Sequence, residues 1–208
     1  MERIKNLAKC IYGKCYTILH TPCKSYKSIG SFVKISRRYI LLNGTEYLCI
    51  GNYVKILDNA RIEVFSKFNN CCFTPPPNLV IEDRVMINQN FHCTCASSVQ
   101  IGENTVITEN CGIFDIIHPY EDVTIAPKDQ PIQTKPVYIG KNCMIGMNSV
   151  IQPGVILGNH VIIGSNSTVL SGEYPSFCVL VGSPAHIIKR YNPKSQQWEK
   201  TDKQGNFL

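Results

Sequence analysis

Residues 139–169 read IGKNCMIGMNSVIQPGVILGNHVIIGSNSTV, and an aliphatic residue recurs in this stretch at every sixth position. The recurring residues are Ile139, Ile145, Ile151, Leu157, Ile163 and Val169. Glycine often follows the aliphatic residue, and a small or β-branched residue often stands four places after it. An α-helix needs apolar residues near a period of about 3.6 and is weakened by recurrent glycine. The spacing therefore predicts one short strand and one corner in each repeat.

The same spacing extends toward the N-terminus. Ile101, Ile107 and Ile113 continue it, and two earlier arrays repeat it. These arrays are Ile50, Leu57 and Ile62, with Leu57 one residue out of step, and then Ile81, Ile87 and Cys93. Strands of successive coils would pair about 4.8 Å apart and satisfy each other's backbone groups. The fold class predicted is all-β, a parallel β-helix built as a solenoid of hexapeptide repeats.

The repeat is interrupted between residues 114 and 137, in a stretch that contains four prolines. The stretch begins with Asp115, His118, Pro119 and Tyr120 close together. Loops longer than about 12–15 residues without structure of their own are usually functional or disordered. We expect loop 114–137 to be a functional excursion from the solenoid.

Four segments together carry a family resemblance. They are IGENTVI (101–107), FDIIHPYED (114–122), the hexads of 139–169, and VGSPAHIIK (181–189). Over roughly residues 30–190 the chain resembles the hexapeptide-repeat acetyltransferases, above all the bacterial enzymes that O-acetylate capsule, exopolysaccharide or O-antigen sugars. This resemblance implies a left-handed β-helix over residues 31–181, a short helical tail over 182–208, and a cytoplasmic homotrimer with active sites between subunits.

The resemblance also implies a reaction. Acetyl-CoA would be the co-substrate, a hydroxyl of a sugar or glycan the acceptor, and His118 the general base for direct attack on the thioester. An acceptor on the second ring nitrogen would fix the tautomer of His118. Asp115 is our candidate partner, with Glu121, Asp122 or a backbone carbonyl as alternatives. An amino sugar nucleotide, acetylated on nitrogen, is the alternative acceptor.

Binding residues follow from the same family pattern. The candidate CoA-binding residues lie in the last coils and the tail: Met144, Gly146, Met147, Ser165, Leu170, Ser171, His186 and Lys189. Asn88 and Asn110 match polar positions of the acceptor cleft, although asparagine is also common at corners. Ala96 stands where galactoside-type relatives carry an acceptor-binding aspartate, which argues against a simple galactoside. Met144, Leu170 and Ser171, and His186 also depart from the family pattern, so we expect weaker phosphate contacts.

The cysteines and histidines permit a metal site but do not favour one. His92, Cys93 and Cys95 are soft ligands of the kind that zinc prefers. Cys93, however, falls on an inward position of the repeat, where a thiol packs as a small apolar group. The chain contains only five histidines, which disfavours a gamma-type carbonic anhydrase, and we expect no metal. Eleven cysteines, an odd number with no Cys-x-x-Cys pair, favour a reducing compartment.

The N-terminal segment is basic. The first 38 residues carry nine Lys and Arg side chains against Glu2 alone, or nine minus one, +8, whereas the remaining 170 carry −2. Residues 1–30 thus form a basic arm or cap, and no nucleic-acid partner is expected. The arm would either contact an anionic membrane or lipid-linked glycan, or cap the solenoid through its apolar residues. The cap residues would be Ile11, Tyr12, Tyr16, Ile18 and Leu19. For the function of the whole chain, a β-helix without catalytic activity is the remaining alternative.

Overall fold

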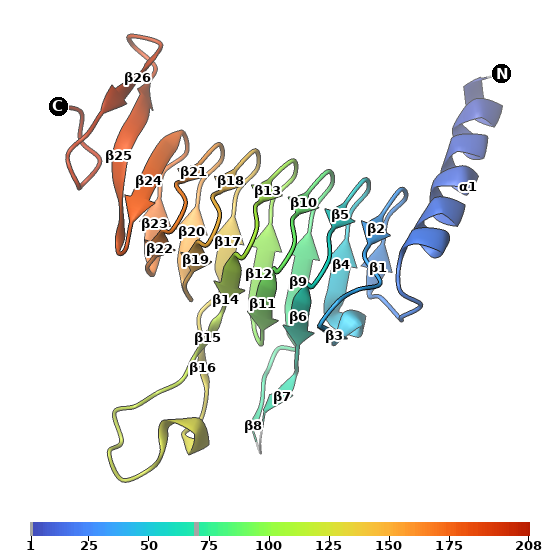
Figure 1. Cartoon of the computed structure of the whole chain (residues 1–208), viewed down its shortest axis with the longest axis horizontal. Helices are drawn as coiled ribbons and strands as arrows, with labels where there is room; N and C mark the ends of the chain where they lie inside the picture. The colour runs from blue at the N-terminus through green and yellow to red at the C-terminus, as the bar shows by residue number, and fades with distance from the viewer. Residues whose placement is uncertain (1, 69–70) are drawn as a thin grey trace.

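The chain forms a solenoid of three parallel sheets, as a computed structural model describing residues 2–68 and 71–208 shows. Helix α1 (Glu2–His20) stands beside the first coil, and the coils then follow one another toward the C-terminus (Figure 1). Each full coil contributes one strand to each sheet. The structure confirms the prediction of an all-β, mainly parallel fold built from stacked repeats.

Sheet A contains seven strands: β1 (Ser28–Ile29), β4 (Leu48–Ile50), β9 (Asn78–Ile81), β12 (Ser98–Ile101), β17 (Val137–Ile139), β20 (Val155–Leu157) and β23 (Gly172–Tyr174). Sheet B begins with β2 (Lys34–Ile35), β5 (Lys55–Ile56), β10 (Met86–Ile87), β13 (Val106–Ile107), β18 (Met144–Ile145), β21 (Ile162–Ile163) and β24 (Cys178–Gly182). Sheet C contains β3 (Leu41–Asn43), β6 (Arg61–Val64), β11 (His92–Cys95), β14 (Gly112–Phe114), β19 (Val150–Ile151) and β22 (Thr168–Val169). A short η1 helix (Thr45–Tyr47) precedes β4.

The aliphatic residues of the repeat stack in rows inside the solenoid. One row in sheet B runs in strand register through Ile35, Ile56, Ile87, Ile107, Ile145, Ile163 and Leu180. These side chains are fully or almost fully buried, and full burial of one such side chain contributes about 1.5–3 kcal/mol. Ile56, not Leu57, occupies the inward position, so the predicted break in step at this coil was wrong. The repeat keeps its period because each inward residue must meet the one above it.

Asparagine forms the corners between sheets B and C. Asn59, Asn90, Asn110, Asn148 and Asn166 all adopt a left-handed backbone with φ of 58–60°. Their side-chain amides form a ladder from coil to coil with N–O distances of 2.8–3.0 Å. Asparagine tolerates this backbone conformation better than most residues and adds a hydrogen bond of its own. The corners therefore fix both the turn and the stacking.

The chain leaves the solenoid twice where sheet C passes to sheet A. The first excursion contains β7 (Lys67–Phe68) and β8 (Cys71–Cys72), and the sequence analysis did not predict it. The second contains β15 (Ile116–Ile117), η2 (Pro127–Asp129) and β16 (Gln133–Thr134), within the predicted loop 114–137. Both project from the same edge of the solenoid (Figure 1). The two excursions therefore stand beside each other.

The C-terminal tail is not helical, and that prediction was wrong. Residues 182–208 form β25 (Ala185–Asn192) and β26 (Gln197–Lys200), which extend sheet B as antiparallel strands after β24. The chain reverses at Gly182, whose φ of 106° suits glycine. Neighbouring β-branched and aromatic residues such as Ile187, Ile188 and Tyr191 favour strands. The tail thus closes the last coil with sheet instead of helix.

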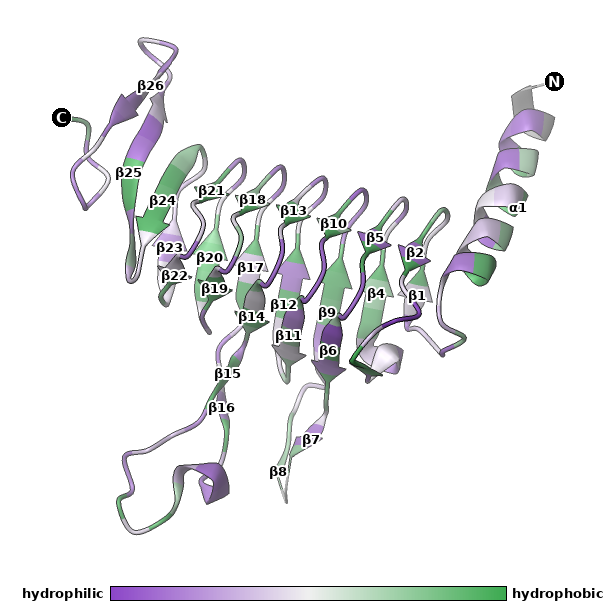
Figure 2. Ribbon diagram, in the orientation of Figure 1, coloured by the Kyte–Doolittle hydropathy of each residue, from purple (hydrophilic) through white to green (hydrophobic). Residues whose placement is uncertain are grey.

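The N-terminal end also differs from the prediction. The first strand, β1, begins at Ser28, so the solenoid starts slightly before residue 31. Of the predicted cap residues only Tyr16 is partly buried, whereas Ile11, Tyr12, Ile18 and Leu19 are exposed. Helix α1 instead meets the first coil through Gly13 and Thr17, and Figure 2 shows hydrophobic and hydrophilic residues mixed along it. Of the predicted cap residues, Tyr12 and Tyr16 reach the ring of Phe32 on the first coil at centroid distances of 5.8 and 6.0 Å, whereas Ile11, Ile18 and Leu19 remain exposed.

Candidate active site

His118 lies at the far end of a short antiparallel ladder. In this ladder Ile116 pairs with Thr134 and Ile117 pairs with Gln133, and His118 follows immediately. The imidazole is exposed, and the loop beyond it returns through Gln130, whose side chain donates to the carbonyl oxygens of Asp122 and Ile125 at 2.8 and 3.0 Å. The hairpin therefore holds His118 away from the coils, open to an acceptor.

Asp115 anchors this hairpin to the solenoid. Its side chain is fully buried, and its two carboxylate oxygens accept the amide N–H groups of Ala96 at 2.8 Å and Ser97 at 2.7 Å. Its carbonyl oxygen accepts the N–H of Lys135 at 2.8 Å, on the returning arm of the loop. Burial raises the pKa of Asp115, although the amide hydrogen bonds act in the opposite direction.

The anchoring role corrects our assignment of Asp115 as the partner of His118. Both carboxylate oxygens are already occupied by amides of the neighbouring coil, and in the described part of the chain no hydrogen bond joins Asp115 to His118. The alternatives, Glu121 and Asp122, accept hydrogen bonds from Tyr120 and Thr124 within the loop itself. A single chain thus leaves both ring nitrogens of His118 without a described protein partner.

An aromatic cluster lies beside His118, and the sequence analysis missed it. The ring of Phe68 stands edge-on to the imidazole, with centroids 6.3 Å apart and an interplanar angle of 77°. Phe65 contacts both Phe68 and Phe73, each at a centroid distance of 5.9 Å. One feature of the sequence could have predicted the first excursion. The six-residue spacing of aliphatic residues is interrupted between Ile62 and Ile81. This excursion supplies an apolar wall next to the candidate base.

Sheet C carries polar groups on its outer face between the two excursions. Arg61 and His92 are paired in register, and Glu63 lies between them, 2.7 Å from the Arg61 guanidinium and 3.8 Å from His92 Nε2. His92 also stands edge-on to Phe114 at 5.0 Å. Desolvation first, and the Arg61 charge second, lower the pKa of His92, which favours the neutral imidazole.

Cys93 and Cys95 point into the core, on the opposite side of β11 from His92. Successive residues of a strand face opposite sides of the sheet, so these thiols and the imidazole do not converge. Burial raises the pKa of both thiols and keeps them protonated. Over residues 2–68 and 71–208, no group of three or more His, Cys, Asp and Glu side chains is arranged to hold a metal ion.

The two candidate acceptor residues have different surroundings. Asn88 follows β10, and its Nδ2 donates to Glu109 at 3.0 Å, whereas its buried Oδ1 has no partner. Asn110 is a corner residue that accepts from Asn90 at 2.8 Å and donates to Asn148 at 2.9 Å. The structure accounts for Asn110 as part of the corner ladder. The Oδ1 of Asn88 is unpaired among the described residues, but it is buried, so it does not by itself offer a contact to an acceptor.

The candidate CoA residues lie toward the end of the solenoid, some on sheet B and the others at the two edges of sheet C. Gly146, Met147 and Ser165 are at its corner with sheet B, and Leu170 and Ser171 follow β22 at the other corner. Met144 is exposed on β18, and His186 and Lys189 lie on β25. A Cβ at Gly146 would stand 2.6 Å from the backbone of Ile163 and Ser165, so this glycine is required by coil stacking.

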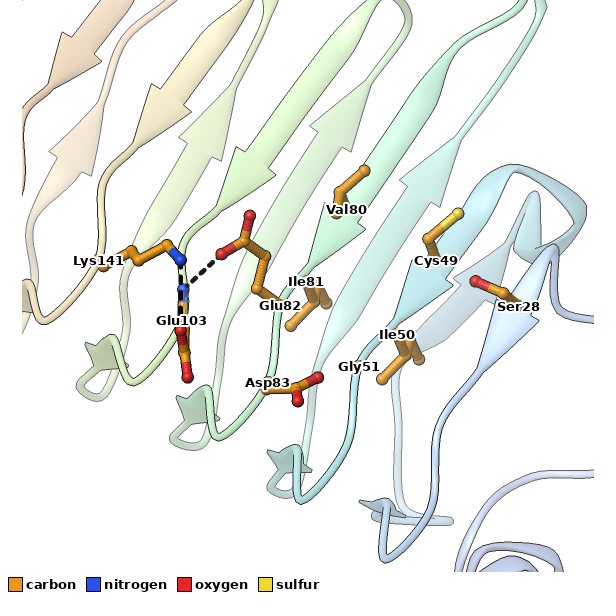
Figure 3. A pocket seen from close by; sticks show the side chains of 10 residues that line it. All are labelled: Ser28, Cys49, Ile50, Gly51, Val80, Ile81, Glu82, Asp83, Glu103 and Lys141. Atoms are coloured by element: carbon orange, nitrogen blue, oxygen red, sulfur yellow. Dashed lines mark hydrogen bonds and ion pairs between the residues drawn. The ribbon is translucent and has the colours of Figure 1, made fainter.

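A separate hollow of about 430 Å³ lies over sheet A, and Figure 3 shows its ten lining side chains. Its acidic groups are occupied by contacts between coils. Asp83 accepts the Asn52 amide at 2.7 Å, which lowers the pKa of this carboxyl. Glu103 pairs with Lys141 at 3.3 Å. The hollow contains none of the candidate site residues.

Comparison with known proteins agrees with the repeat. Residues 136–171 match the family model described as bacterial transferase hexapeptide (six repeats). This segment of the chain therefore contains the hexapeptide repeat that is described for bacterial transferases. Over 129 residues it is 35% identical to the putative lipopolysaccharide biosynthesis O-acetyl transferase WbbJ of Escherichia coli (strain K12). That match covers 59% of the chain and 65% of the relative, less than two thirds of its length.

Solved structures resemble the fold of the whole solenoid. The N-acyltransferase AntD from Bacillus cereus, in complex with dTDP and 3-hydroxybutyryl-CoA, is 21% identical with a TM-score of 0.67, covering 82% of this chain and 86% of AntD. A mutant of AntD with dTDP and coenzyme A is 20% identical with a TM-score of 0.67, covering 88% and 90%. At this level of identity the likeness shows the fold. The predicted resemblance to the hexapeptide-repeat family is thereby confirmed.

Proposed function

We propose that this protein is an acyltransferase that moves an acetyl group from acetyl-CoA to a hydroxyl of a sugar or surface-glycan precursor. The observation that carries the proposal is the exposed His118 on its anchored hairpin, in a chain with the bacterial transferase hexapeptide. The match to a protein described as an O-acetyl transferase of lipopolysaccharide biosynthesis supports oxygen as the acceptor atom.

His118 would act as the general base. A neutral imidazole takes the proton of the acceptor hydroxyl as the hydroxyl oxygen attacks the thioester carbonyl carbon. The carbon–sulfur bond then breaks, and the proton passes from the imidazolium to the leaving sulfur. Phe68 restricts the imidazole on one side by edge-on contact. No acyl-enzyme is required in this sequence.

A second copy of the chain would complete the site. His118 lies on a hairpin that projects from the corner between sheets C and A, whereas most of the candidate CoA residues lie on sheet B or at its corner with sheet C in the last coils. We propose a homotrimer of left-handed coils, in which the hairpin of one subunit reaches the CoA residues of its neighbour. Met144 and Met147 would offer apolar surface to the pantetheine chain, and Lys189 would meet phosphate.

The test is incubation of the purified protein with radiolabelled acetyl-CoA and a panel of free and nucleotide-linked sugars. Half of the panel would carry an amino group. We expect label in a sugar product that mild alkali releases, because an O-acetyl ester is alkali-labile and an N-acetyl amide is not. Alkali-stable product would show an N-acyltransferase, and the absence of any labelled sugar would overturn the proposed function.

A further inference from the structure

Helix α1 leaves five large apolar and aromatic side chains mostly exposed. The exposed fractions of Leu7, Ile11, Tyr12, Ile18 and Leu19 lie between 57% and 73%. At about 100° per residue, Leu7, Ile11 and Ile18 fall within about 40° of one another on the helix surface. Leu19 and Tyr12 extend this arc to about 140°. We call these five residues the apolar arc.

The opposite side of α1 is the one that binds the solenoid. The Gly13 carbonyl accepts the Phe32 N–H at 3.1 Å, and a Cβ at Gly13 would stand 2.6 Å from the Phe32 ring. The Thr17 hydroxyl accepts the Val33 N–H at 3.1 Å and lies 3.1 Å from the Gly30 carbonyl oxygen. These contacts fix the rotation of the helix about its axis. Most of its apolar arc therefore faces outward, although the Tyr12 ring at one border of the arc also meets Phe32 at a centroid distance of 5.8 Å.

This orientation is the reverse of that in an ordinary surface helix, whose apolar stripe faces the core. Exposed apolar patches of this kind mark interaction sites with proteins or membranes. In the described residues no helix is long and apolar enough to cross a membrane. A surface that covers the arc must therefore lie alongside α1.

Charge identifies that surface. Between residues 5 and 38 the chain has eight Lys and Arg side chains and no Asp or Glu. Lys5 and Lys9 flank the apolar arc on one side. Lys14 flanks it on the other side, where its Nζ donates to the Ile29 carbonyl oxygen at 2.7 Å. A hollow of about 780 Å³ opens beside Leu19 and His20, with Lys34, Arg37 and Arg38 along it. Arg38 pairs with Asp58, and Arg37 donates to the Leu19 carbonyl oxygen at 3.2 Å. Within the described residues, Lys5, Lys9, Lys34 and Arg37 have no carboxylate partner.

We propose that α1 lies in the plane of an anionic lipid surface, with its apolar arc at the acyl boundary and the flanking cations at the headgroup phosphates. Amphipathic helices with basic flanks bind membranes in this manner, and near-surface cations add to the attraction. A second copy is a poorer occupant, because helices packed through the apolar arc would bring their lysine flanks together. This inference concerns α1 alone and does not depend on the proposed function.

The experiment is co-sedimentation of the full-length protein with vesicles. One set contains phosphatidylcholine alone, and the other contains equal parts of phosphatidylcholine and phosphatidylglycerol. We expect at least about tenfold tighter binding to the anionic vesicles, weakened by added salt. Wild-type protein that binds neither set would overturn the proposal.

A pair of double variants isolates the apolar arc. Ile11→Asp with Ile18→Asp places two carboxylates in the arc, whereas Asn6→Asp with Cys10→Asp places two on exposed positions outside it. The Ile11 and Ile18 variant is expected to bind anionic vesicles at least about tenfold more weakly than the control. Each double variant replaces two neutral side chains by two carboxylates, so the two variants have the same net charge. Equal binding by the two variants would overturn the proposal, as would a changed oligomeric mass of the Ile variant without a change in vesicle binding.

Discussion

Asp115 shows how a single residue connects the fold to the candidate site. We expect Asp115→Ala to lower the free energy of unfolding by at least about 2 kcal/mol, because each buried group left unsatisfied costs about 1–3 kcal/mol. The groups in question are the amides of Ala96 and Ser97. Chemical denaturation measures the effect. Asp122→Ala, an exposed change in the same loop, is the control and is expected to leave the free energy of unfolding close to that of wild type. Equal stability of the two variants would contradict the anchor.

The roles of single residues were only partly predictable. His118 was singled out because it lies near the start of a long break in a regular repeat and matches the catalytic histidine of the family it resembles, and its role stays a prediction. Asp115 lies three residues away and was misassigned, because proximity in sequence did not reveal that its oxygens meet Ala96 and Ser97 of the previous coil. The contact between Phe68 and His118 joins residues 50 positions apart, and no local pattern encodes it.

At the scale of elements, the corners can be tested at Asn148. Its φ is 60°, and its side chain links Asn110 and Asn166. Asn148→Ala and Asn148→Gly lose the same two hydrogen bonds, but alanine also pays the left-handed penalty. This penalty is about 1–2 kcal/mol, and the greater conformational freedom that glycine loses on folding offsets about 0.5–1 kcal/mol of it. We therefore expect the glycine variant to be the more stable of the two, by up to about 1.5 kcal/mol, in thermal or chemical unfolding.

The matched control for the corner is Gln152, which is absent from the positions with positive φ. There the order is expected to reverse, since glycine loses more conformational freedom on folding, by about 0.5–1 kcal/mol relative to alanine. If Asn148→Gly were less stable than Asn148→Ala, as expected for the two variants at Gln152, the corner would carry no backbone strain.

Among the elements, the period of six predicted the strands and their inward residues because every coil must repeat the same contacts. The C-terminal hairpin follows the last coil and has no such constraint, so family expectation suggested a helix where β25 and β26 form. The first excursion interrupts the repeat at Phe65, yet nothing in its residues specified a position beside His118.

For the whole molecule, the cysteines report on the solenoid core. Cys93, Cys95, Cys111, Cys143 and Cys178 are buried, whereas Cys10, Cys15, Cys23, Cys71 and Cys72 are exposed. Burial raises the pKa of every thiol in the first set, to about 12 for Cys178, and only the thiolate reacts readily. Iodoacetamide followed by mass spectrometry is expected to label the exposed set first and the buried set only on unfolding. Equally fast labelling of Cys93 in folded protein would contradict the inward assignment.

The overall arrangement of the molecule was predictable as far as the repeat extends. Composition placed the positive charge in the N-terminal segment, but both proposed uses of that segment fitted the sequence. The rotation of α1 leaves Ile11, Ile18 and Leu19 exposed, and this rotation depends on Gly13 and Thr17 meeting residues 30–33. Such a contact between a helix and the first coil has no periodic signature.

The most direct test of the central claim is the steady-state rate of acetyl transfer by His118→Ala, measured beside its acetyl-CoA affinity and its oligomeric mass. A general base contributes about 10²–10⁴ in rate, so we expect kcat to fall by that factor. Acetyl-CoA affinity and mass should stay at wild-type values, because His118 is exposed on a hairpin whose anchor is Asp115. Transfer at the wild-type rate by correctly assembled His118→Ala protein would contradict the account.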